Sequence, residues 1–412
     1  MACFIKHILC RMQQILVIFM KVLILVCGEG LGHTARCIAM GRAFERAGDE
    51  VHFGAYGYSK DLIERKGFSA TYIPPEITLV GNSGTLDLLK STFYTIKNFD
   101  PFLFFRFLKL VKKEKPDIVI SDSYFTVLFV AKLKSCPSYL VLNQSNMEEF
   151  FLDKGIFGVF VGKIAKLVYL FIYNLVDGII VPDFPMPYTI CQKNLYFSEK
   201  ISKKVYYSGP LVGANYNDVT PANVSKPHVL STLGGFGYRK NIFFKVIESA
   251  KMNPDINYTL LSGPGVAPSE FKDIPKNVTV LDFIDDQFPY IKSSDALIIP
   301  GGHSTIMESL SFGVPILSFP DTDHNEQQKN ASVVEESDLG FNLDYSTTPE
   351  FILKCLNEII YDGKFKENTQ KMKSMAKSLN GPDNIVNYLK SMTENKLKNK
   401  SNNDKDPKNK NI

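Results

Sequence analysis

The segment KVLILVCGEGLGHTAR (21–36) joins a short apolar run to a glycine-rich turn and the start of a helical pattern. The run has the length and composition of a buried strand. Alternate glycines, including Gly30 and Gly32, permit a sharp turn that presents backbone amides, as phosphate-binding turns do. A dinucleotide fingerprint requires glycine where His33 stands, and an acidic residue at the end of the second strand (50–55), which is absent. The segment therefore predicts a strand, a turn and a helix, and argues against a nicotinamide cofactor.

Similar apolar runs recur along the chain and alternate with helical patterns, which predicts parallel sheets buried on both faces. The first series is KVLILV (21–26), EVHFGA (50–55), SATYI (69–73), DIVIS (117–121), SYLVL (138–142) and DGIIV (177–181). The second is HVLSTL (228–233), NYTLLS (257–262), NVTVL (277–281), DALIIP (295–300) and VPILSF (314–319). A stretch rich in Pro, Gly and Asn separates them. The sequence predicts two doubly wound, Rossmann-like α/β domains that face each other across a cleft.

The beginning of the chain, MACFIKHILCRMQQILVIFM, places basic residues before an apolar run, as signal peptides do. That run has no small-residue cleavage site and continues into the first strand, so we expect no cleaved signal and a natural start at Met20. The last helix of the second domain could pack against the first domain. The expected parts are an N-terminal extension (1–19), a first domain (20–205), a linker region (206–227), a second domain (228–393) and a basic tail (394–412).

The composition narrows the class of protein. Hydrophobic residues make up 45% and charged residues 22% of the 412 residues, which is typical of a soluble globular protein. Much of the net charge of +4 comes from 394–412, which we expect to be disordered because it has almost no apolar residues. The nearly neutral body argues against nucleic acid as a partner. The seven cysteines form no CxxC pair, which favours unpaired thiols and a cytoplasmic location over disulfides or a zinc site.

Two segments are unusually apolar, STFYTIKNFDPFLFFRFLKLVKK (91–113) and IFGVFVGKIAKLVYLFIYNLV (156–176). One interpretation is that both form helices packed on the sheet. The other is that they form a surface for an anionic membrane, since basic residues stand beside aromatic and aliphatic ones. Because Lys163 and Lys166 interrupt the second segment, it would lie on a membrane rather than cross it. Both interpretations remain open at this stage.

A histidine that acts as a base near neutral pH needs a partner that orients its ring. The run DIVISDSY (117–124) places Asp122 at the carboxyl end of the fourth strand, at the same edge of the sheet as His33. We interpret the two residues as a His and Asp pair. Each residue alone is equally well explained as a helix cap.

A second polar cluster lies in DALIIPGGHSTIMESLSFGVPILSFPDTDHNEQQKNA (295–331). A strand ends in two glycines and a helix then begins with His, Ser and Thr, which together form an anion site of amides and hydroxyls. One turn later a glutamate can bind a ribose diol, and after the next strand a carboxylate and an amide suit sugar hydroxyls. The turn LGGFGYRKN (233–241) could face the same phosphates. The residues selected in this way are Gly235, Gly302, His303, Ser304, Thr305, Glu308, Glu326 and Gln327.

These motifs resemble those of GT-B glycosyltransferases. The resemblance rests on GLGHTAR (30–36), FIDD (283–286), GGHSTIMESLSFGVPIL (301–317) and EQQKNA (326–331), and is densest in the second domain. The chain resembles family 28, which includes the N-acetylglucosaminyltransferase of lipid II synthesis, and the family 1 UDP-glycosyltransferases. It is most similar to archaeal-type relatives. The resemblance implies a hexosyltransferase, with an acceptor-binding first domain and a second domain that binds a UDP-sugar.

The resemblance also implies roles for matching residues. His33 would be the general base for the acceptor hydroxyl, with Asp122 as its partner. The reaction would be a single inverting displacement that needs no cofactor and no metal. The remaining assignments are Phe283 and Ile284 to the uracil ring, Glu308 to the ribose, Ser304 and Thr305 to the diphosphate, Glu326 and Gln327 to the sugar, and Gly30, Gly32 and Arg36 to the loop on the acceptor side.

The sequence departs from the family 1 pattern in two places. Pro300 stands where a histidine usually precedes the diphosphate loop, with His303 shifted into the loop itself, and Glu326 replaces an aspartate. These changes leave the phosphate contacts and the donor sugar open. Asp321-Thr322-Asp323 has the spacing of a DxD metal motif, but that motif belongs to the other glycosyltransferase fold, and we do not assign it a metal.

Two alternatives to a transferase remain, a nucleotide-sugar epimerase of the same architecture and a non-catalytic protein that binds nucleotide-sugars. The apolar, basic segments of the first domain favour a lipid or lipid-linked acceptor. They would place the protein at the inner face of the cell membrane as a peripheral protein. The sugar and the linkage are not specified by the motifs.

Overall fold

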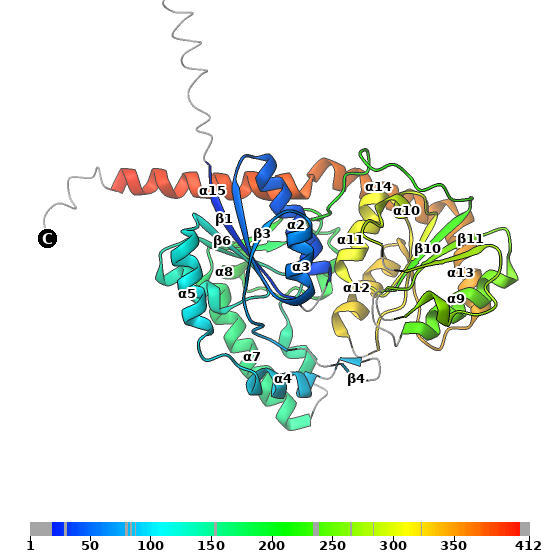
Figure 1. Cartoon of the computed structure of the whole chain (residues 1–412), viewed down its shortest axis with the longest axis horizontal. Helices are drawn as coiled ribbons and strands as arrows, with labels where there is room; N and C mark the ends of the chain where they lie inside the picture. Colours follow the sequence, from blue (N-terminus) through cyan, green and yellow to red (C-terminus); the bar gives the residue numbers. More distant parts are fainter. Residues whose placement is uncertain are drawn as a thin grey trace, which may run out of the picture.

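The computed structural model describes residues 19–28, 31–78, 81–82, 85–86, 88–151, 155–233, 239–263, 266–282, 284–322 and 324–403. Within these residues the chain forms two α/β domains that lie side by side (Figure 1). Each domain is built on a parallel sheet with helices on both faces. The fold class predicted from the alternation of strands and helices is confirmed.

The first sheet has seven strands in the order β3-β2-β1-β6-β7-β8-β9, and all of its neighbouring strands are parallel. The chain order reverses between β1 and β6, where the register pairs Val26 with Asp122 at the carboxyl ends. Such a reversal leaves a crevice between the loops that follow the two strands. The strands are β1 Lys21–Val26, β2 Glu50–Ala55, β3 Ser69–Tyr72, β6 Ile118–Asp122, β7 Ser138–Val141, β8 Gly178–Val181 and β9 Val205–Tyr207.

Two hydrophobic layers cover this sheet, which explains why its central strands are apolar on both faces. One layer contains Phe44 of α2 and Leu389 of the last helix, α15 (Gly381–Asn403), and the other contains Phe107 of α5 and Ile172 of α7. The helices of the first domain are α2 Leu31–Arg46, α3 Gly57–Arg65, α4 Leu88–Lys97, α5 Leu103–Glu114, α6 Thr126–Leu133, α7 Gly155–Leu175 and α8 Glu199–Ser202, with short 3-10 turns η1 Met147–Phe151 and η2 Ile190–Lys193.

The second sheet has six parallel strands in the order β12-β11-β10-β13-β14-β15, with a reversal between β10 and β13. Its strands are β10 His228–Thr232, β11 Asn257–Leu261, β12 Val278–Leu281, β13 Ala296–Ile299, β14 Ile316–Ser318 and β15 Gly340–Asn342. Helices α9 and α13 contribute to the core on one face, and α11, α12 and α14 to that on the other. These helices, with the short α10 and η4, are α9 Lys240–Met252, η4 Pro268–Glu270, α10 Phe288–Lys292, α11 His303–Phe312, α12 Asn325–Glu336, α13 Pro349–Tyr361 and α14 Gly363–Leu379.

Every strand expected from an apolar run is present. The sequence patterns missed β9, β15 and the small antiparallel pair β4 Gly81–Asn82 and β5 Thr85–Leu86. Each of these strands has only two or three residues. Elements this short give no periodic signal, because their strand geometry is imposed by a neighbouring strand rather than by their own sequence.

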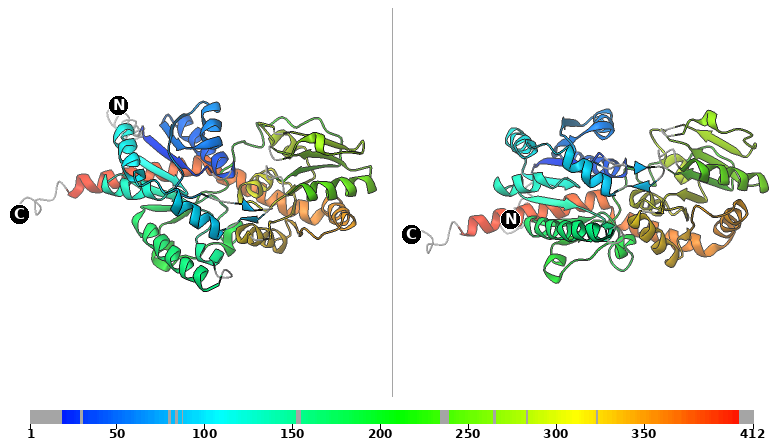
Figure 2. Two further views of the ribbon diagram at one scale, coloured as in Figure 1. Left: turned by 60° about the horizontal axis from the view of Figure 1, so that its bottom comes forward. Right: turned by 90° about the horizontal axis from the view of Figure 1, so that it is seen from below.

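The last helix, α15 Gly381–Asn403, returns from the second domain along the first (Figures 1 and 2). Ile385 and Leu389 enter the core of the first domain, and Tyr388 stacks on Tyr206 with ring centroids 3.8 Å apart. The helix continues through 394–403, where the sequence predicted a disordered tail. A helix that is already nucleated by packing extends at little cost, especially through Lys and Glu.

The two apolar segments differ in the structure. Helix α5 buries Phe107 and Leu110 against the sheet, as expected for a packed helix. Most side chains of α7 are instead exposed, with Ile156 at 93% and Phe157 at 67% exposure. By length and composition α7 is the one helix of the described residues that could cross a membrane. The stacked rings of Phe129 and Phe171 attach it to the first domain.

Candidate active site

His33 lies in the first turn of α2, directly after the glycine turn that follows β1. Its Nδ1 atom is 2.8 Å from Oδ1 of Asp122, the last residue of β6. The structure thus brings together the two residues that the sequence analysis paired, at the point where the strand order reverses. The His33 side chain is one-third exposed, whereas Asp122 is completely buried.

Arg36, one helical turn after His33, forms a bidentate ion pair with the same carboxylate. Its Nε atom lies 2.6 Å from Oδ2 of Asp122, and a terminal nitrogen lies 2.7 Å from Oδ1. Burial alone raises the pKa of a carboxyl group, but Arg36 and then His33 outweigh burial and hold the pKa of Asp122 well below its usual range. Asp122 is therefore an anion whose charge is already matched by a guanidinium.

The contacts of His33 limit the roles of its ring nitrogens. Its Nδ1 atom lies near both the carboxylate of Asp122 and a terminal nitrogen of Arg36, at 2.8 and 2.9 Å. A guanidinium only donates and a carboxylate only accepts, so Nδ1 either donates to Asp122 or accepts from Arg36, according to the tautomer. In the tautomer that donates from Nδ1 to Asp122, Nε2, which makes no hydrogen bond within the described residues, carries the lone pair. That tautomer suits proton abstraction by Nε2.

The second domain presents the N-terminus of α11 to this histidine. The helix begins at His303 after Gly302, and no side chain caps its first turn. The two domains touch here, since a Cβ atom added to Gly32 would lie 2.6 Å from Oγ of Ser304. A glycine at position 32 is therefore required by this close approach. Uncapped amides and the positive end of the helix dipole make the start of α11 an anion site next to His33.

A hydrogen-bond chain links the two sides of the site. Arg36 donates to Oδ1 of Asn143 at 3.1 Å, and Nδ2 of Asn143 donates to Oε1 of Glu326 at 2.6 Å. Asn194 of the first domain similarly donates to Asn330 of α12 at 2.9 Å. The carboxylate predicted to contact the donor sugar is thus connected, through two side chains, to the partner of the predicted base.

Glu308 is the third residue after Thr305 in α11, and it is 8% exposed. Burial raises the pKa of Glu308 to about 7, against the opposing effect of a 2.7 Å hydrogen bond from Nε2 of Gln287. The carboxyl group is therefore close to half protonated at neutral pH. It can accept or donate a hydrogen bond, which suits a ribose diol.

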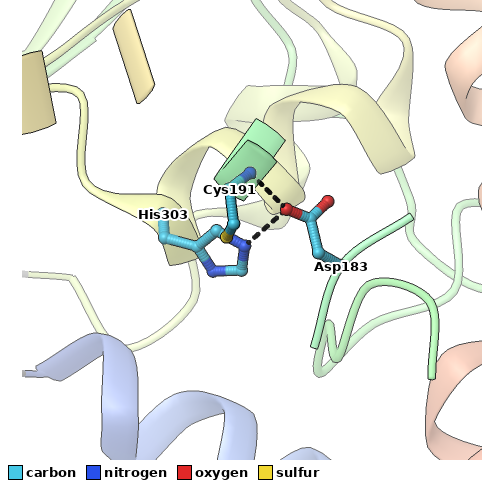
Figure 3. A group of neighbouring side chains, drawn as sticks. All are labelled: Asp183, Cys191 and His303. Atoms are coloured by element: carbon cyan, nitrogen blue, oxygen red, sulfur yellow. Dashed lines mark hydrogen bonds and ion pairs between the residues drawn. The ribbon is translucent and has the colours of Figure 1, made fainter. Parts of the chain in front are cut away.

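A second buried histidine pair crosses the domain boundary (Figure 3). Nε2 of His303 lies 3.2 Å from Oδ2 of Asp183, which follows β8 of the first domain. With Cys191 of η2 these residues form a cluster whose candidate ligand atoms lie within 4.8 Å of one another. The same Oδ2 atom also accepts hydrogen bonds from Thr189 and from the Cys191 amide, each at 2.9 Å. Because its lone pairs are engaged, the cluster is better described as a hydrogen-bonded network than as a metal site.

Asp321, in the acidic loop after β14, is likewise engaged by side chains of the described residues. Arg239 pairs with Asp321 through Nε at 3.1 Å and through a second, shorter contact, and the Tyr345 hydroxyl donates to Asp321 at 2.6 Å. The neighbouring Gln327 uses its Oε1 to accept from the Asp321 amide at 3.1 Å. Asp321 thus shapes this loop, while Asp323 lies outside the described residues.

The remaining predicted residues fall into two groups. Ser304 and Thr305 lie in the first turn of α11, and Ile284 packs beside the core of the second domain. Gly30, Gly235 and Phe283 lie outside the described residues.

Sequence reasoning missed three features of the site. It placed Arg36 in the acceptor-side loop without linking it to Asp122, although the i, i+3 spacing from His33 puts both residues on one helix face. It also passed over Asp183 and Asn143. Both follow predicted strands at their carboxyl ends, the same signal that identified Asp122.

Comparisons with known proteins agree with this fold. The profile of the glycosyltransferase family 28 C-terminal domain matches residues 249–387. An uncharacterized glycosyltransferase of Methanosarcina acetivorans is 51% identical over 370 residues, which cover 90% of this chain and 98% of the relative. The UDP-N-acetylglucosamine–N-acetylmuramyl-(pentapeptide) pyrophosphoryl-undecaprenol N-acetylglucosamine transferase of Clostridium novyi is 24% identical over 391 residues, with the same coverages of 90% and 98%. The solved structure of the glycotransferase of kitacinnamycin superposes with a TM-score of 0.70 at 15% identity and covers 90% of this chain and 98% of that chain.

Two facing parallel-sheet domains with an anion site at their junction define a GT-B glycosyltransferase. The chain belongs to the glycosyltransferases, with a C-terminal domain of family 28. It is an enzyme of the transferase class that acts with a nucleotide-sugar donor and an acceptor.

Proposed function

We propose that the protein is an inverting glycosyltransferase that moves a sugar from a UDP-sugar to an acceptor hydroxyl, with His33 as the general base. One observation carries the proposal. The Asp122-bound imidazole stands beside the uncapped N-terminus of α11, with Gly32 and Ser304 in contact between them. A base beside an anion site at the boundary of two domains is what a displacement at an anomeric carbon requires. The uracil base is favoured by the UDP-sugar named for the Clostridium relative.

The reaction balances as a single displacement. Nε2 of His33 takes the proton of the acceptor hydroxyl while the acceptor oxygen bonds to the anomeric carbon. The bond between that carbon and the β-phosphate oxygen breaks, and its electron pair leaves with the nucleoside diphosphate. Backbone amides and the dipole at the start of α11 offset the charge that develops there, so we propose that no metal takes part.

A donor screen followed by product analysis tests the proposal. Thermal shift across UDP-, dTDP-, GDP- and ADP-sugars identifies the nucleotide, because a ligand that binds only the folded protein raises its melting temperature. The best donor is then incubated with and without candidate acceptors, and the products are analysed for anomeric configuration. Isomerised donor with no need for an acceptor would replace the transferase by an epimerase. Donor binding without turnover, and cellular function unaffected by His33→Ala, would indicate a binding protein.

We also propose that the acceptor is lipid or lipid-linked and that the protein lies at the inner face of the cell membrane. The support is α7, whose Ile156, Phe157 and Phe160 side chains are 93%, 67% and 59% exposed, with Lys163 on the same helix. Exposed aromatic and aliphatic groups beside lysine suit an anionic lipid surface. The Clostridium relative is named for a pyrophosphoryl-undecaprenol acceptor, which has the same chemistry.

Liposome sedimentation tests this surface. The wild type should pellet with vesicles that contain anionic phospholipid, and Phe157→Ser/Phe160→Ser should reduce the bound fraction several-fold because it removes buried apolar contact. Tyr361→Ser, at a 64% exposed position on α13 of the other domain, is the matched control and should bind like the wild type. A protein that stays in solution at low salt would count against the membrane proposal without affecting the transferase proposal.

A further inference from the structure

His303 and Asp183 belong to different domains but form one buried pair. His303 is the first residue of α11, and Asp183 follows β8 in the first domain. Their side chains are 3% and 0% exposed, with Nε2 and Oδ2 at 3.2 Å. The family resemblance assigned His303 to the donor site by position alone and said nothing of Asp183. The contact means that a residue of the donor-side helix is oriented by the opposite domain.

Asp183 has no lysine or arginine partner among the described residues to offset its burial. Its other hydrogen-bond donors are neutral, namely the Phe184 amide at 2.7 Å, the Thr189 hydroxyl and the Cys191 amide. No lysine or arginine of the described residues forms an ion pair with it. Burial raises the pKa of the Asp183 carboxyl group, but the contacts with His303 and Cys191 outweigh it, so that the pKa is lowered. A buried carboxylate needs a compensating partner, and His303 is the one ionisable side chain that the described residues place in an ion-pair contact with it.

The second nitrogen of His303 has no partner. Nδ1 is buried and makes no hydrogen bond within the described residues. Figure 3 shows the edge of the ring that carries Nδ1 turned away from Asp183. A buried N–H without an acceptor is costly, so this nitrogen needs an acceptor that the described protein does not provide. Because the same residue opens α11, whose first turn is uncapped, the missing acceptor would be an anion at the helix start.

We propose that Asp183 is a positioning residue for the donor: it holds His303 across the domain boundary, so that Nδ1–H donates to the diphosphate of the nucleotide-sugar. The inference rests on the proposed function and adds to it that the first domain takes part in binding the donor. His303 forms no covalent bond. Its charge balances Asp183 and offsets the negative charge that grows on the departing diphosphate. Donor affinity therefore depends on the two domains being in contact.

Calorimetric binding of UDP and uridine to the full-length protein separates the diphosphate contribution from that of the nucleoside. Asp183→Asn and His303→Gln should each weaken UDP binding by about 10-fold or more, the size of a charge-assisted hydrogen bond, and leave uridine binding unchanged. The double variant should lose no more than either single variant, because the two residues act as one unit. Cys191→Ser retains the ion pair and is the matched control.

Histidine-selective ¹⁵N NMR adds a measurement that a purely structural contact would not change. The His303 signal, assigned with His303→Gln, should show both ring nitrogens protonated in the wild-type complex with UDP, and a neutral ring in Asp183→Asn. If Asp183→Asn does not fold, the wild-type complex with UDP still tests the inference, since a neutral His303 ring in that complex would overturn it. UDP binding unchanged by Asp183→Asn would also overturn it and leave the proposed function standing. A wild type that binds none of UDP, dTDP, GDP or ADP would instead refute the proposed function.

Discussion

The described residues contain two His and Asp pairs with a buried aspartate, and the pairs differ in the other partners of that aspartate. In the pair of His33 and Asp122, Arg36 already matches the charge of the carboxylate, so the cluster is neutral when the imidazole is neutral. In the pair of His303 and Asp183, the surrounding donors are neutral, so the cluster reaches neutrality only when the imidazole is protonated. The two clusters therefore differ in net charge for the same protonation state of the imidazole, and the proposed roles of base and cation rest on this difference.

Glu308 shows what happens to a buried carboxyl group that has no ion-pair partner among the described residues. Its hydrogen-bond partner is the neutral amide of Gln287, and its pKa is raised to about 7. Asp122 and Asp183, which contact basic side chains, have lowered pKa values although they are at least as deeply buried. Charge compensation, rather than depth, therefore determines whether a buried acid of this protein is ionised.

Removing the base should have the largest effect. His33→Ala should lower kcat by about 10²- to 10⁴-fold, the usual contribution of a general base, while UDP affinity stays near the wild-type value. His303→Gln should instead mainly weaken UDP binding and change kcat less. Steady-state kinetics with the identified donor, together with UDP titration, measure both. Equal losses of affinity in the two variants would show that the two histidines do not have separate tasks.

Removing the guanidinium from the first pair should mainly affect stability. Arg36→Met leaves Asp122 buried with His33 as its remaining positive partner, and breaking a buried ion pair in this way costs about 3–5 kcal/mol of unfolding free energy. Urea unfolding is the measurement. Arg36→Lys keeps the charge, so its stability should lie between those of the wild type and Arg36→Met. A cost of less than about 1 kcal/mol in Arg36→Met would break the comparison.

The raised pKa of Glu308 predicts that the unfolding free energy decreases as the pH rises. Between the ordinary pKa of 4.5 and the folded value of about 7, the folded state binds more protons than the unfolded state. The unfolding free energy therefore falls as the pH rises through this window, by about 3 kcal/mol when the window has been crossed. Glu308→Gln, measured without ligand, should unfold at a higher temperature than the wild type at pH 8 and lose this advantage at pH 5. A difference that does not vary with pH would contradict the burial argument.

An exposed ion pair should have the smallest effect. Arg46 of α2 lies 2.7 Å from Asp383 of α15, but both side chains are about half exposed, at 59% and 45%. Arg46→Gln should therefore change the unfolding free energy by about 0–1 kcal/mol, since water and salt screen such pairs. Urea unfolding beside Arg36→Met compares two arginines of one helix that differ in burial. A cost above about 2 kcal/mol would show that α15 depends on this contact more than its exposure implies.

Local sequence predicted the architecture because each strand carries its own signal. Runs such as KVLILV and DALIIP are apolar on both faces, which occurs only where helices cover both sides of a sheet. The glycine turn and DIVISDSY then placed His33 and Asp122 at carboxyl ends of strands, and the structure brings them within hydrogen-bond distance. Local sequence did not determine how exposed α7 is or where α15 ends. The pattern of an apolar helix or of a charged helix is the same whichever surface the helix packs against.

What the sequence by itself determined is the pair of parallel-sheet domains and the identity of the polar residues at their edges, since periodicity and turn residues act locally. What only the tertiary structure decided is which charged and polar groups surround each histidine. Arg36 reaches Asp122 over 86 positions of the chain, and Asp183 reaches His303 over 120. A charge in a protein interior responds to its neighbours in space, and those neighbours are assembled only when the domains fold and meet.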